Sequence, residues 1–316
     1  MRFEPEILDS PSGARLAVRV RAPEGEPRGI VQIHHGLSEH AGRYEDFAEF
    51  LADRGFAVGA HDHRGHGRTD ADDALPGVFA AKDGAGKVTT DALAVETLLR
   101  TRFADTPLIV FGHSMGGVIA MNHAMQRDDA RQGGPLAGLA IWNSNLDLGP
   151  RAGLIRFVLG AEKLFRKKTA PSSWMDALTF SAWGKAVKGG SSRFDWLSRD
   201  ADAVKAYVDD PLCGRAASIS LWEDLLRLNE IGEDEHRLRN LRTDLPIHLA
   251  TGGEDPATDK GKAVKTLASR LYNARFTDVT MRFDPSGRHE TLNDLGKDKA
   301  MEDFADWAGR VFTQTG

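Results

Sequence analysis

The sequence predicts an α/β protein with a mostly parallel, doubly wound sheet and a mainly helical cap insertion. Two observations carry this prediction. Short, near-continuous apolar runs alternate with stretches of helical periodicity, as expected for parallel strands buried on both faces. Residues 145–243 interrupt the alternation and hold four of the six tryptophans. We therefore expect residues 1–144 and 244–316 to form the core, and residues 145–243 to cover the C-terminal edge of the sheet, where open sheets bind ligands.

The strands are predicted from runs that are short, apolar and bounded by turn residues. The first 25 residues resemble an antiparallel hairpin that turns at Pro11, Ser12 and Gly13. Later strands are expected at residues 29–36, 56–60, 107–111, 138–142, 246–250 and 278–283.

Helices are predicted between these strands, because apolar residues recur there on one side of a helical repeat. The stripes run from Tyr44 to Leu51, Val88 to Leu99, Val264 to Leu271 and Met301 to Ala308. Each stripe would cover one face of the sheet, and the alternation implies right-handed crossovers.

Composition excludes several classes of protein. The chain has 316 residues, of which 41% are hydrophobic and 28% charged, so it can build a core and is not a disordered chain. Its net charge of -5 disfavours a nucleic-acid partner. Cys213 is the single cysteine, which rules out an intrachain disulfide. No signal peptide or membrane-spanning run is visible, so we expect a cytoplasmic setting.

A Gly-x-Ser-x-Gly motif, GHSMG at residues 112–116, carries the strongest chemical signal. It directly follows the run 107–111 and precedes an apolar helical stretch. Glycines suit a sharp strand-to-helix turn, because a Cβ at either flank would clash with neighbouring backbone. Such a turn exposes Ser114 Oγ at the start of a helix. We interpret Ser114 as a nucleophile; the alternative is a glycine-rich turn without chemistry.

A serine nucleophile needs a base and an orienting acid, which follow it along the chain in the order acid, then histidine. Asp255 and His289 each lie just past a predicted strand, and we assign them as acid and base. Asp147, after the strand at 138–142, is the rival acid. Glu254 and Asp259 are interpreted as solvated loop acids, and His248, inside a strand, as a packed histidine.

An oxyanion needs two preorganised N–H donors. The backbone N–H of Met115, directly after the serine, is one candidate, and that of Leu37, after the His-Gly turn, is the other. Leu37 is also expected to line the substrate pocket, together with His113. Cys213 is expected beside the pocket or buried in the cap.

Histidines at positions 61, 63 and 66 surround Asp62 and Arg64, which suggests a zinc site. A bound cation would repel the guanidinium of Arg64. We therefore expect no metal, and interpret the segment as a turn held by hydrogen bonds of Asp62 and Arg64. Nothing else in the sequence calls for a cofactor.

Several segments together resemble the monoacylglycerol lipase and lysophospholipase branch of the α/β-hydrolase fold, a group also labelled serine aminopeptidase S33-like. The segments are HHGLSEHAGRY at 34–44, DHRGHGRTD at 62–70, GHSMGG at 112–117, GGEDPATDKGKAVKTLASRL at 252–271 and SGRHETLND at 286–294. The resemblance implies a triad at Ser114, Asp255 and His289 and oxyanion donors at Leu37 and Met115. It also implies hydrolysis of carboxylic esters of lipid-like substrates.

Two alternatives remain open. A peptidase or amidase of the proline iminopeptidase type would need cap acids to hold a free α-amino group, and Glu223, Asp224 and Glu230 are available. A ligand-binding protein that kept the fold without the reaction is the other, although no triad member is missing. The sequence does not indicate an oligomeric state.

Residues 151–168 combine six basic residues and one acid with an apolar stripe of Leu154, Val158, Ala161 and Phe165. A basic amphipathic helix suits transient contact with an anionic membrane surface. A cap helix that packs its apolar face on the core and shows its lysines to water is the expectation that we favour.

Overall fold

The computed structural model describes residues 3–315. Within them, the strands form one sheet in the order β1-β2-β4-β3-β5-β6-β7-β8. The two pairings of β2 are antiparallel and the pairings from β4 to β8 are parallel, which confirms the predicted fold class. The strands are β1 Glu6–Asp9, β2 Arg15–Arg21, β3 Gly29–His34, β4 Phe56–His61, β5 Leu108–His113, β6 Gly138–Trp142, β7 Ile247–Gly252 and β8 Val279–Asp284.

The predicted strands agree with the observed ones to within about two residues at either end. The central strands are buried at every position, which explains why their apolar runs stand out in the sequence. The expectation for residues 29–36 is wrong at its end, because His35 and Gly36 leave the sheet to start a turn. That turn lies at the C-terminal edge of the sheet, beside Ser114.

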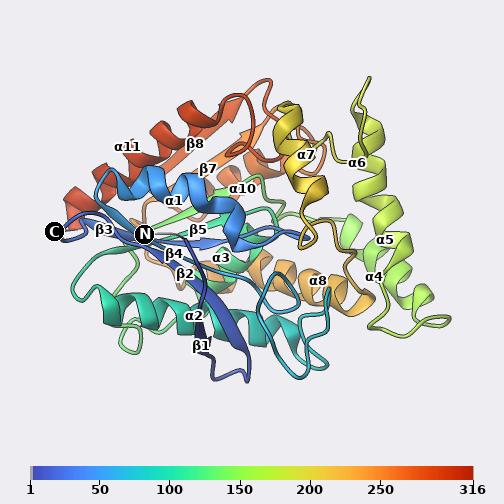
Figure 1. Cartoon of the computed structure of the whole chain (residues 1–316), viewed down its shortest axis with the longest axis horizontal. Helices are drawn as coiled ribbons and strands as arrows, with labels where there is room; N and C mark the ends of the chain where they lie inside the picture. Colours follow the sequence, from blue (N-terminus) through green and yellow to red (C-terminus); the bar gives the residue numbers. More distant parts are fainter. Residues whose placement is uncertain (1–2, 316) are drawn as a thin grey trace.

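Helices cover both faces of the sheet (Figure 1). One face packs against α1 (Glu45–Ala52), which follows the short helix η1 (Ala41–Tyr44), and against α11 (Lys297–Thr315). The other face packs against α2 (Gly84–Arg102), α3 (Met115–Gln126), α8 (Ile219–Glu233) and α10 (Lys262–Asn273). The first of the four apolar stripes identified in the sequence begins at the end of η1 and continues on α1, and the others lie on α2, α10 and α11; each faces the core.

The segment between β6 and β7 is helical. It contains α4 (Arg151–Glu162), α5 (Ser173–Leu178), α6 (Phe180–Ala186), α7 (Ala201–Asp209), α8 and α9 (Glu235–Leu238). The helices α4 to α7 lie beyond the C-terminal ends of the strands, whereas α8 joins the layer that packs on α2 and α3 (Figure 1). None of the helices in residues 3–315 is both long enough and apolar enough to cross a bilayer.

Candidate active site

Ser114 occupies the sharp turn between β5 and α3 (Figure 1). Its backbone has a φ of +55°, a region that is strained for a residue with a side chain. A Cβ on Gly112 would come within 2.1 Å of the carbonyl oxygen of Gly116, and one on Gly116 within 2.0 Å of that of His34. Only glycines therefore permit this turn, and the motif GHSMG is a structural requirement of the site.

The structure brings the three predicted residues of the triad together. His289 Nε2 lies 2.9 Å from Ser114 Oγ, and His289 Nδ1 lies 3.0 Å from Asp255 Oδ2. Asp255 follows β7 and His289 follows β8, so three loops at one sheet edge supply the three side chains. Trp196 packs on the imidazole of His289 with a ring separation of 4.8 Å.

The carboxyl group of Asp255 is completely buried, and both of its oxygens accept hydrogen bonds. Besides His289, its Oδ2 accepts hydrogen bonds from Asn143 Nδ2 at 3.1 Å and Thr258 Oγ1 at 3.0 Å, and Oδ1 accepts one from the N–H of Ala257. Burial alone would raise the pKa of Asp255, but His289 and these donors lower it, so the carboxylate stays ionised.

The rival acids have other partners. Glu254 and Asp259 are partly exposed loop acids, paired with Lys260 and Arg151. Among the described residues, no hydrogen bond joins Asp147 to His289. His248 is buried in β7, where its Nδ1 accepts from Trp142 Nε1 at 2.9 Å, as expected of a packed histidine.

Two backbone N–H groups beside Ser114 have no hydrogen-bond acceptor among the described residues. They belong to Leu37 and Met115, and both residues line the cavity above the serine. The Met115 N–H also lies at the N-terminus of α3, where the helix dipole favours negative charge. Two unpaired backbone donors therefore lie beside the cavity, at the residues expected to hold an oxyanion.

A buried ion-pair network holds the turn that contains Leu37. Glu39 Oε1 accepts from the N–H of Gly36 at 2.6 Å and from Tyr44 Oη at 2.9 Å. Arg43 binds Glu39 and, through two contacts of 2.6 and 2.7 Å, Glu290. Since Glu290 follows His289 directly, this network ties the turn to the histidine loop.

His113 takes part in the same network. Its Nε2 lies 3.0 Å from the carbonyl oxygen of His289 and its Nδ1 lies 3.4 Å from Glu39 Oε1. Burial alone would lower the pKa of His113, but Glu39 raises it. Burial alone would raise the pKa of Glu39, but His113 and Arg43 lower it strongly. His113 lines the cavity as expected, yet its ring nitrogens face protein groups.

The cavity above Ser114 has a volume of about 470 Å³, within the usual range for small-molecule sites. Its walls are mostly apolar and come from α4, α5, α6 and α8, with Trp183, Trp196 and Trp222 prominent. Cys213 does not lie on these walls. It is buried behind them against Tyr207 and Trp196, and burial raises the pKa of its thiol. Of the two places expected for Cys213, beside the pocket as a substrate contact or buried in the cap, the structure shows the buried one.

The sequence analysis missed several residues of this site, namely Asn143, Thr258, Glu39, Arg43 and Glu290. Asn143 offers a usable signal, because it follows the predicted strand 138–142 directly and so lies at the edge that carries Ser114. The partners of Glu39 and Arg43 depend on which loops meet in space, and no local pattern reveals that.

Several known proteins have sequences and folds similar to those of this chain. The family described as "Serine aminopeptidase, S33" matches residues 25–296. A monoacylglycerol lipase of Mycolicibacterium smegmatis is 27% identical, with 93% of each chain covered, and a human monoglyceride lipase is 27% identical, with 92% of this chain and 84% of that one covered.

Solved structures extend the likeness to the whole fold. A thermostable carboxyl esterase of Bacillus coagulans, solved with glycerol, has a TM-score of 0.86 at 26% identity and covers 99% of both chains. A lipase in an open form has a TM-score of 0.82 at 27% identity, with 98% of this chain and 99% of that one covered. The chain therefore belongs to the serine aminopeptidase S33 family of the α/β-hydrolase fold.

Proposed function

We propose that this protein is a serine hydrolase that cleaves carboxylic esters of lipid-like substrates, of the monoacylglycerol or lysophospholipid type. The continuous hydrogen-bonded line from Asp255 through His289 to Ser114, beneath an apolar cavity with two free N–H donors, carries the proposal. The names of the relatives, monoacylglycerol lipases and an esterase, support the same class of substrate.

The geometry suits a two-step reaction through an acyl-enzyme. Ser114 Oγ attacks the ester carbonyl while His289 Nε2 accepts its proton, and the N–H groups of Leu37 and Met115 hold the oxyanion. His289 then gives the proton to the departing alcohol. Water then attacks the acyl-enzyme while His289 Nε2 accepts its proton, and His289 returns the proton to Ser114 Oγ as the acid leaves. Asp255 keeps the imidazole oriented in both steps. This reaction needs no metal or organic cofactor.

The aminopeptidase alternative lacks support from the cap acids. Glu223 pairs with Lys163, Glu230 with Arg156, and Asp224 accepts from the N–H of Ala85. None of these three acids lines the cavity. Three acids do line it. Glu39 and Glu290 are bound to Arg43, and Asp259 pairs with Arg151, so each already has a cationic partner in the protein.

Covalent labelling tests the class of reaction. A fluorophosphonate probe should label the intact protein and fail to label Ser114→Ala, because the probe reports an activated serine. Failure of the intact, folded protein to label would favour the ligand-binding alternative. A series of esters of increasing acyl length, with matched aminoacyl amides, should show hydrolysis of the esters and little of the amides.

We propose in addition that the cap, residues 145–243, contacts membranes transiently. The helix α4 packs Ile155, Val158 and Leu159 inward, in agreement with the favoured expectation of a half-buried cap helix, but it ends at Glu162, before Phe165. Phe157 and Phe165 are 72% and 79% exposed, so large apolar side chains face outward.

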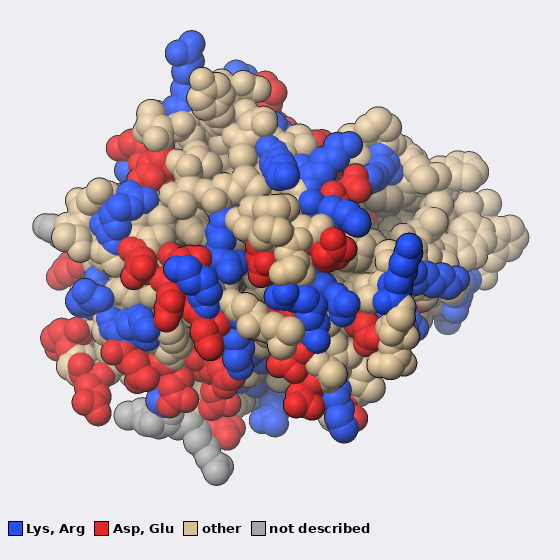
Figure 2. All heavy atoms as spheres, turned by 90° about the horizontal axis from the view of Figure 1, so that it is seen from above, with Lys and Arg blue, Asp and Glu red and all other residues tan. Residues whose placement is uncertain are grey.

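The outer end of the cap supports contact with an anionic surface. This end, to the right in Figures 1 and 2, shows mostly uncharged atoms with basic residues beside them and few acidic ones. Several basic residues of the segment pair with acids elsewhere, among them Arg156 with Glu230 and Lys163 with Glu223, so its free positive charge is smaller than the sequence count indicates. Binding to anionic vesicles that weakens as salt rises would support the proposal, since salt screens exposed charges.

A further inference from the structure

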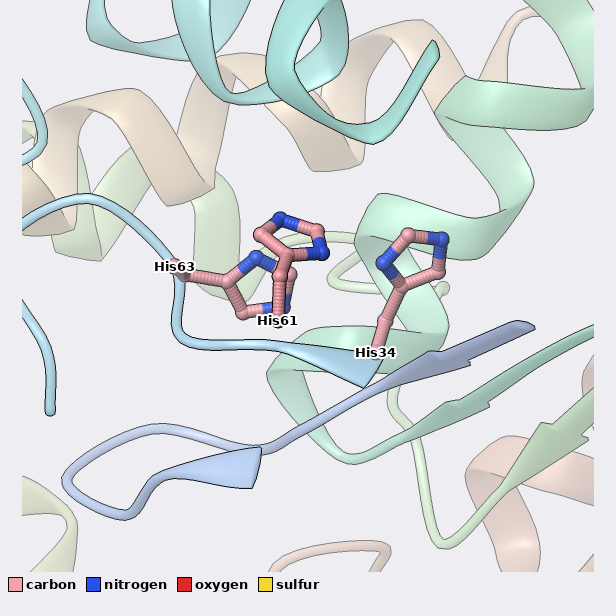
Figure 3. Close-up of side chains that lie close together, drawn as sticks. All are labelled: His34, His61 and His63. Carbon is pink, nitrogen blue, oxygen red and sulfur yellow. The ribbon is translucent and has the colours of Figure 1, made fainter. Parts of the chain in front are cut away.

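Three buried histidines outside the proposed triad converge at the ends of two neighbouring strands. His34 ends β3, His61 ends β4, and His63 follows two residues later. All three are completely buried, and one ring nitrogen of each lies within 4.8 Å of the other two. Figure 3 shows the rings gathered together, with a nitrogen of His34 directed toward His61. None of the three lines the cavity above Ser114, so the cluster is separate from the proposed reaction.

Most of the polar atoms in this cluster lack a protein partner. Within residues 3–315, no hydrogen bond reaches His34 Nδ1 or either ring nitrogen of His61 or His63. A neutral imidazole has one N–H donor and one lone pair, and leaving them unpaired in a protein interior costs free energy. The three side chains therefore turn unused lone pairs and N–H groups toward a common point.

A chain of hydrogen bonds sets the orientation of one of these lone pairs. Glu96 Oε2 lies 2.8 Å from His123 Nε2, and His123 Nδ1 lies 3.1 Å from His34 Nε2. Burial alone would raise the pKa of Glu96, but His123 and Arg127 lower it to about 2, so Glu96 is an ionised acceptor. A neutral His123 that donates from Nε2 to Glu96 accepts at Nδ1, and His34 then donates from Nε2. The lone pair of His34 consequently lies on Nδ1, inside the cluster.

This arrangement matches the way proteins orient metal ligands, in which a carboxylate fixes the tautomer of a ligating histidine from behind. The three side chains offer imidazole nitrogens from one completely buried cluster. Neutral imidazole nitrogens suit zinc and other late divalent transition metals.

The sequence suggested that a bound cation would repel the guanidinium of Arg64, but this objection does not apply to His34, His61 and His63. Arg64 is bound to the carbonyl oxygen of Phe79, to Ser12 and to Asp73, so its charge is engaged outside the cluster. Asp62 accepts from Arg19 and from the N–H groups of Ala41 and Arg68, so it is not a ligand but leaves a buried negative charge nearby.

We propose that His34, His61 and His63 bind one divalent transition-metal ion of the zinc class, as a structural site beneath the turn that contains Leu37. Three atoms within 4.8 Å of one another share a point no more than about 2.8 Å from each. Shifts of less than about 1 Å therefore reach the Zn–N distance of about 2.0–2.1 Å. The ion would join the ends of β3 and β4. The N–H of His63 donates to His35 Nε2, and this hydrogen bond connects the metal site to the turn that contains Leu37.

A second cluster, His40, Asp210 and Cys213, also brings three ligand atoms within 4.8 Å. Its groups are already in use, because His40 Nε2 binds Asp210 at 2.8 Å and His40 Nδ1 accepts from the N–H of Gly42. Burial also raises the pKa of the Cys213 thiol, which keeps it protonated. The three-histidine cluster is the better site, and the second cluster serves as the control.

Metal titration of the full-length protein tests the proposal. Protein stripped with a chelator should bind one Zn²⁺ per chain, and its thermal midpoint should rise by several degrees, since an ion that binds only the folded chain opposes unfolding. His63→Gln should abolish this binding and this rise. His123→Gln, which leaves all three ligands in place, should weaken binding by about 10–100-fold. Cys213→Ser should behave as the unaltered protein.

Two further measurements keep the test decisive if a histidine variant fails to fold. Protein labelled at Ser114 by a fluorophosphonate should still bind the ion, which separates this cluster from His289. Bound Co²⁺ should show a tetrahedral spectrum without a thiolate charge-transfer band. A folded protein that binds no ion, an ion that survives His63→Gln, or a thiolate band from Cys213 would overturn the proposal.

Discussion

The edge of the sheet around Ser114 buries charged carboxylates, whereas the outer end of the cap exposes large apolar side chains. At the edge, Asp255 and Glu39 are buried, and every carboxylate oxygen has a partner. At the outer end of the cap, Phe157 and Phe165 are large apolar side chains that face outward. The first region is preorganised by hydrogen bonds that span the chain, whereas the second is held to the molecule by a few inward-facing residues.

The two regions are suited to two different tasks, stabilisation of a transition state and admission of the substrate. Electrostatic stabilisation of a transition state requires groups fixed in advance, because reorganisation during the reaction costs free energy. Admission of a lipid-like molecule requires apolar surface that reaches from outside to the cavity, and α4 and α5 contribute to both its wall and the exposed end. Substitutions in the two regions should therefore change different measured quantities.

The largest effect is expected at Ser114, the proposed nucleophile. Ser114→Ala should reduce ester turnover by a factor on the order of 10⁴–10⁶, because loss of one triad member disables the set. The measurement is kcat on a soluble short-chain ester, with circular dichroism to verify the fold. Turnover close to that of the unaltered protein, with contaminating esterase excluded, would contradict the proposed mechanism.

Two matched aspartate substitutions test the acid. Asp255→Asn should lower kcat by a factor on the order of 10³–10⁴, because the amide favours the wrong tautomer of His289. Asp147→Asn should lower kcat less than about threefold, since Asp147 makes no hydrogen bond to the histidine in the described structure. The assignment fails if the substitution at position 147 proves the more damaging.

Exposed phenylalanines of the cap test the second region. Phe157→Ser combined with Phe165→Ser should lower activity on vesicle-borne ester at least about tenfold, because partial burial of two Phe side chains, each contributing about 1.5–3 kcal/mol when fully buried, exceeds the roughly 1.4 kcal/mol that a tenfold change requires. Activity on a soluble short-chain ester should stay unchanged, since neither residue lines the cavity.

Tyr272→Ser is the matched control for this pair, because Tyr272 is 78% exposed on α10, outside the cap. Charge reversal by Lys167→Glu with Lys168→Glu should reproduce the loss at low salt and have little effect at high salt. Equal losses on soluble and vesicle-borne substrates would mean that the helix acts only as a lid.

The smallest effect is expected where α8 meets the N-terminus of α2. Asp224 accepts from the N–H of Ala85, and burial raises the pKa of its carboxyl from 3.8 to about 6. Ionisation is thus harder in the folded chain, so stability falls as the pH rises through this interval. Asp224→Asn should raise the free energy of unfolding by about 1 kcal/mol at pH 8, after allowance for its partial exposure, and change it little at pH 4. Denaturant unfolding at both pH values is the measurement, and equal changes at both would refute this explanation.

The strands, and the residues that follow them at turns, could be predicted from the sequence because they depend on local sequence pattern. The buried strands β3 to β7 are continuous apolar runs, and Ser114 and Asp255 each follow such a run at a turn. His289 follows β8, a half-exposed strand that its apolar residues still mark in the sequence. Because parallel strands end at one edge, residues placed in this way must meet there. The fold class and the three converging side chains could therefore be predicted without coordinates.

Features that depend on long-range contacts could not be predicted in this way. The apolar stripe predicted on 151–168 combined residues that point to opposite sides, since Val158 packs inward while Phe165 is exposed, and the helix ends between them. Helical periodicity alone does not show which of two apolar faces is covered. Likewise, Glu96 and His34 are joined only through His123, on a third element.

The separation of Ser114 and His289 along the chain has a consequence for folding. The two residues are 175 positions apart, and β7 and β8 pair with the sheet only after the whole helical segment that precedes them has been synthesised. Contacts of such long range form slowly, because the loop must be closed before the contact gives any stability. Recovery of esterase activity during refolding should therefore lag behind the recovery of helical signal, so that activity would report the last contacts of the sheet to form.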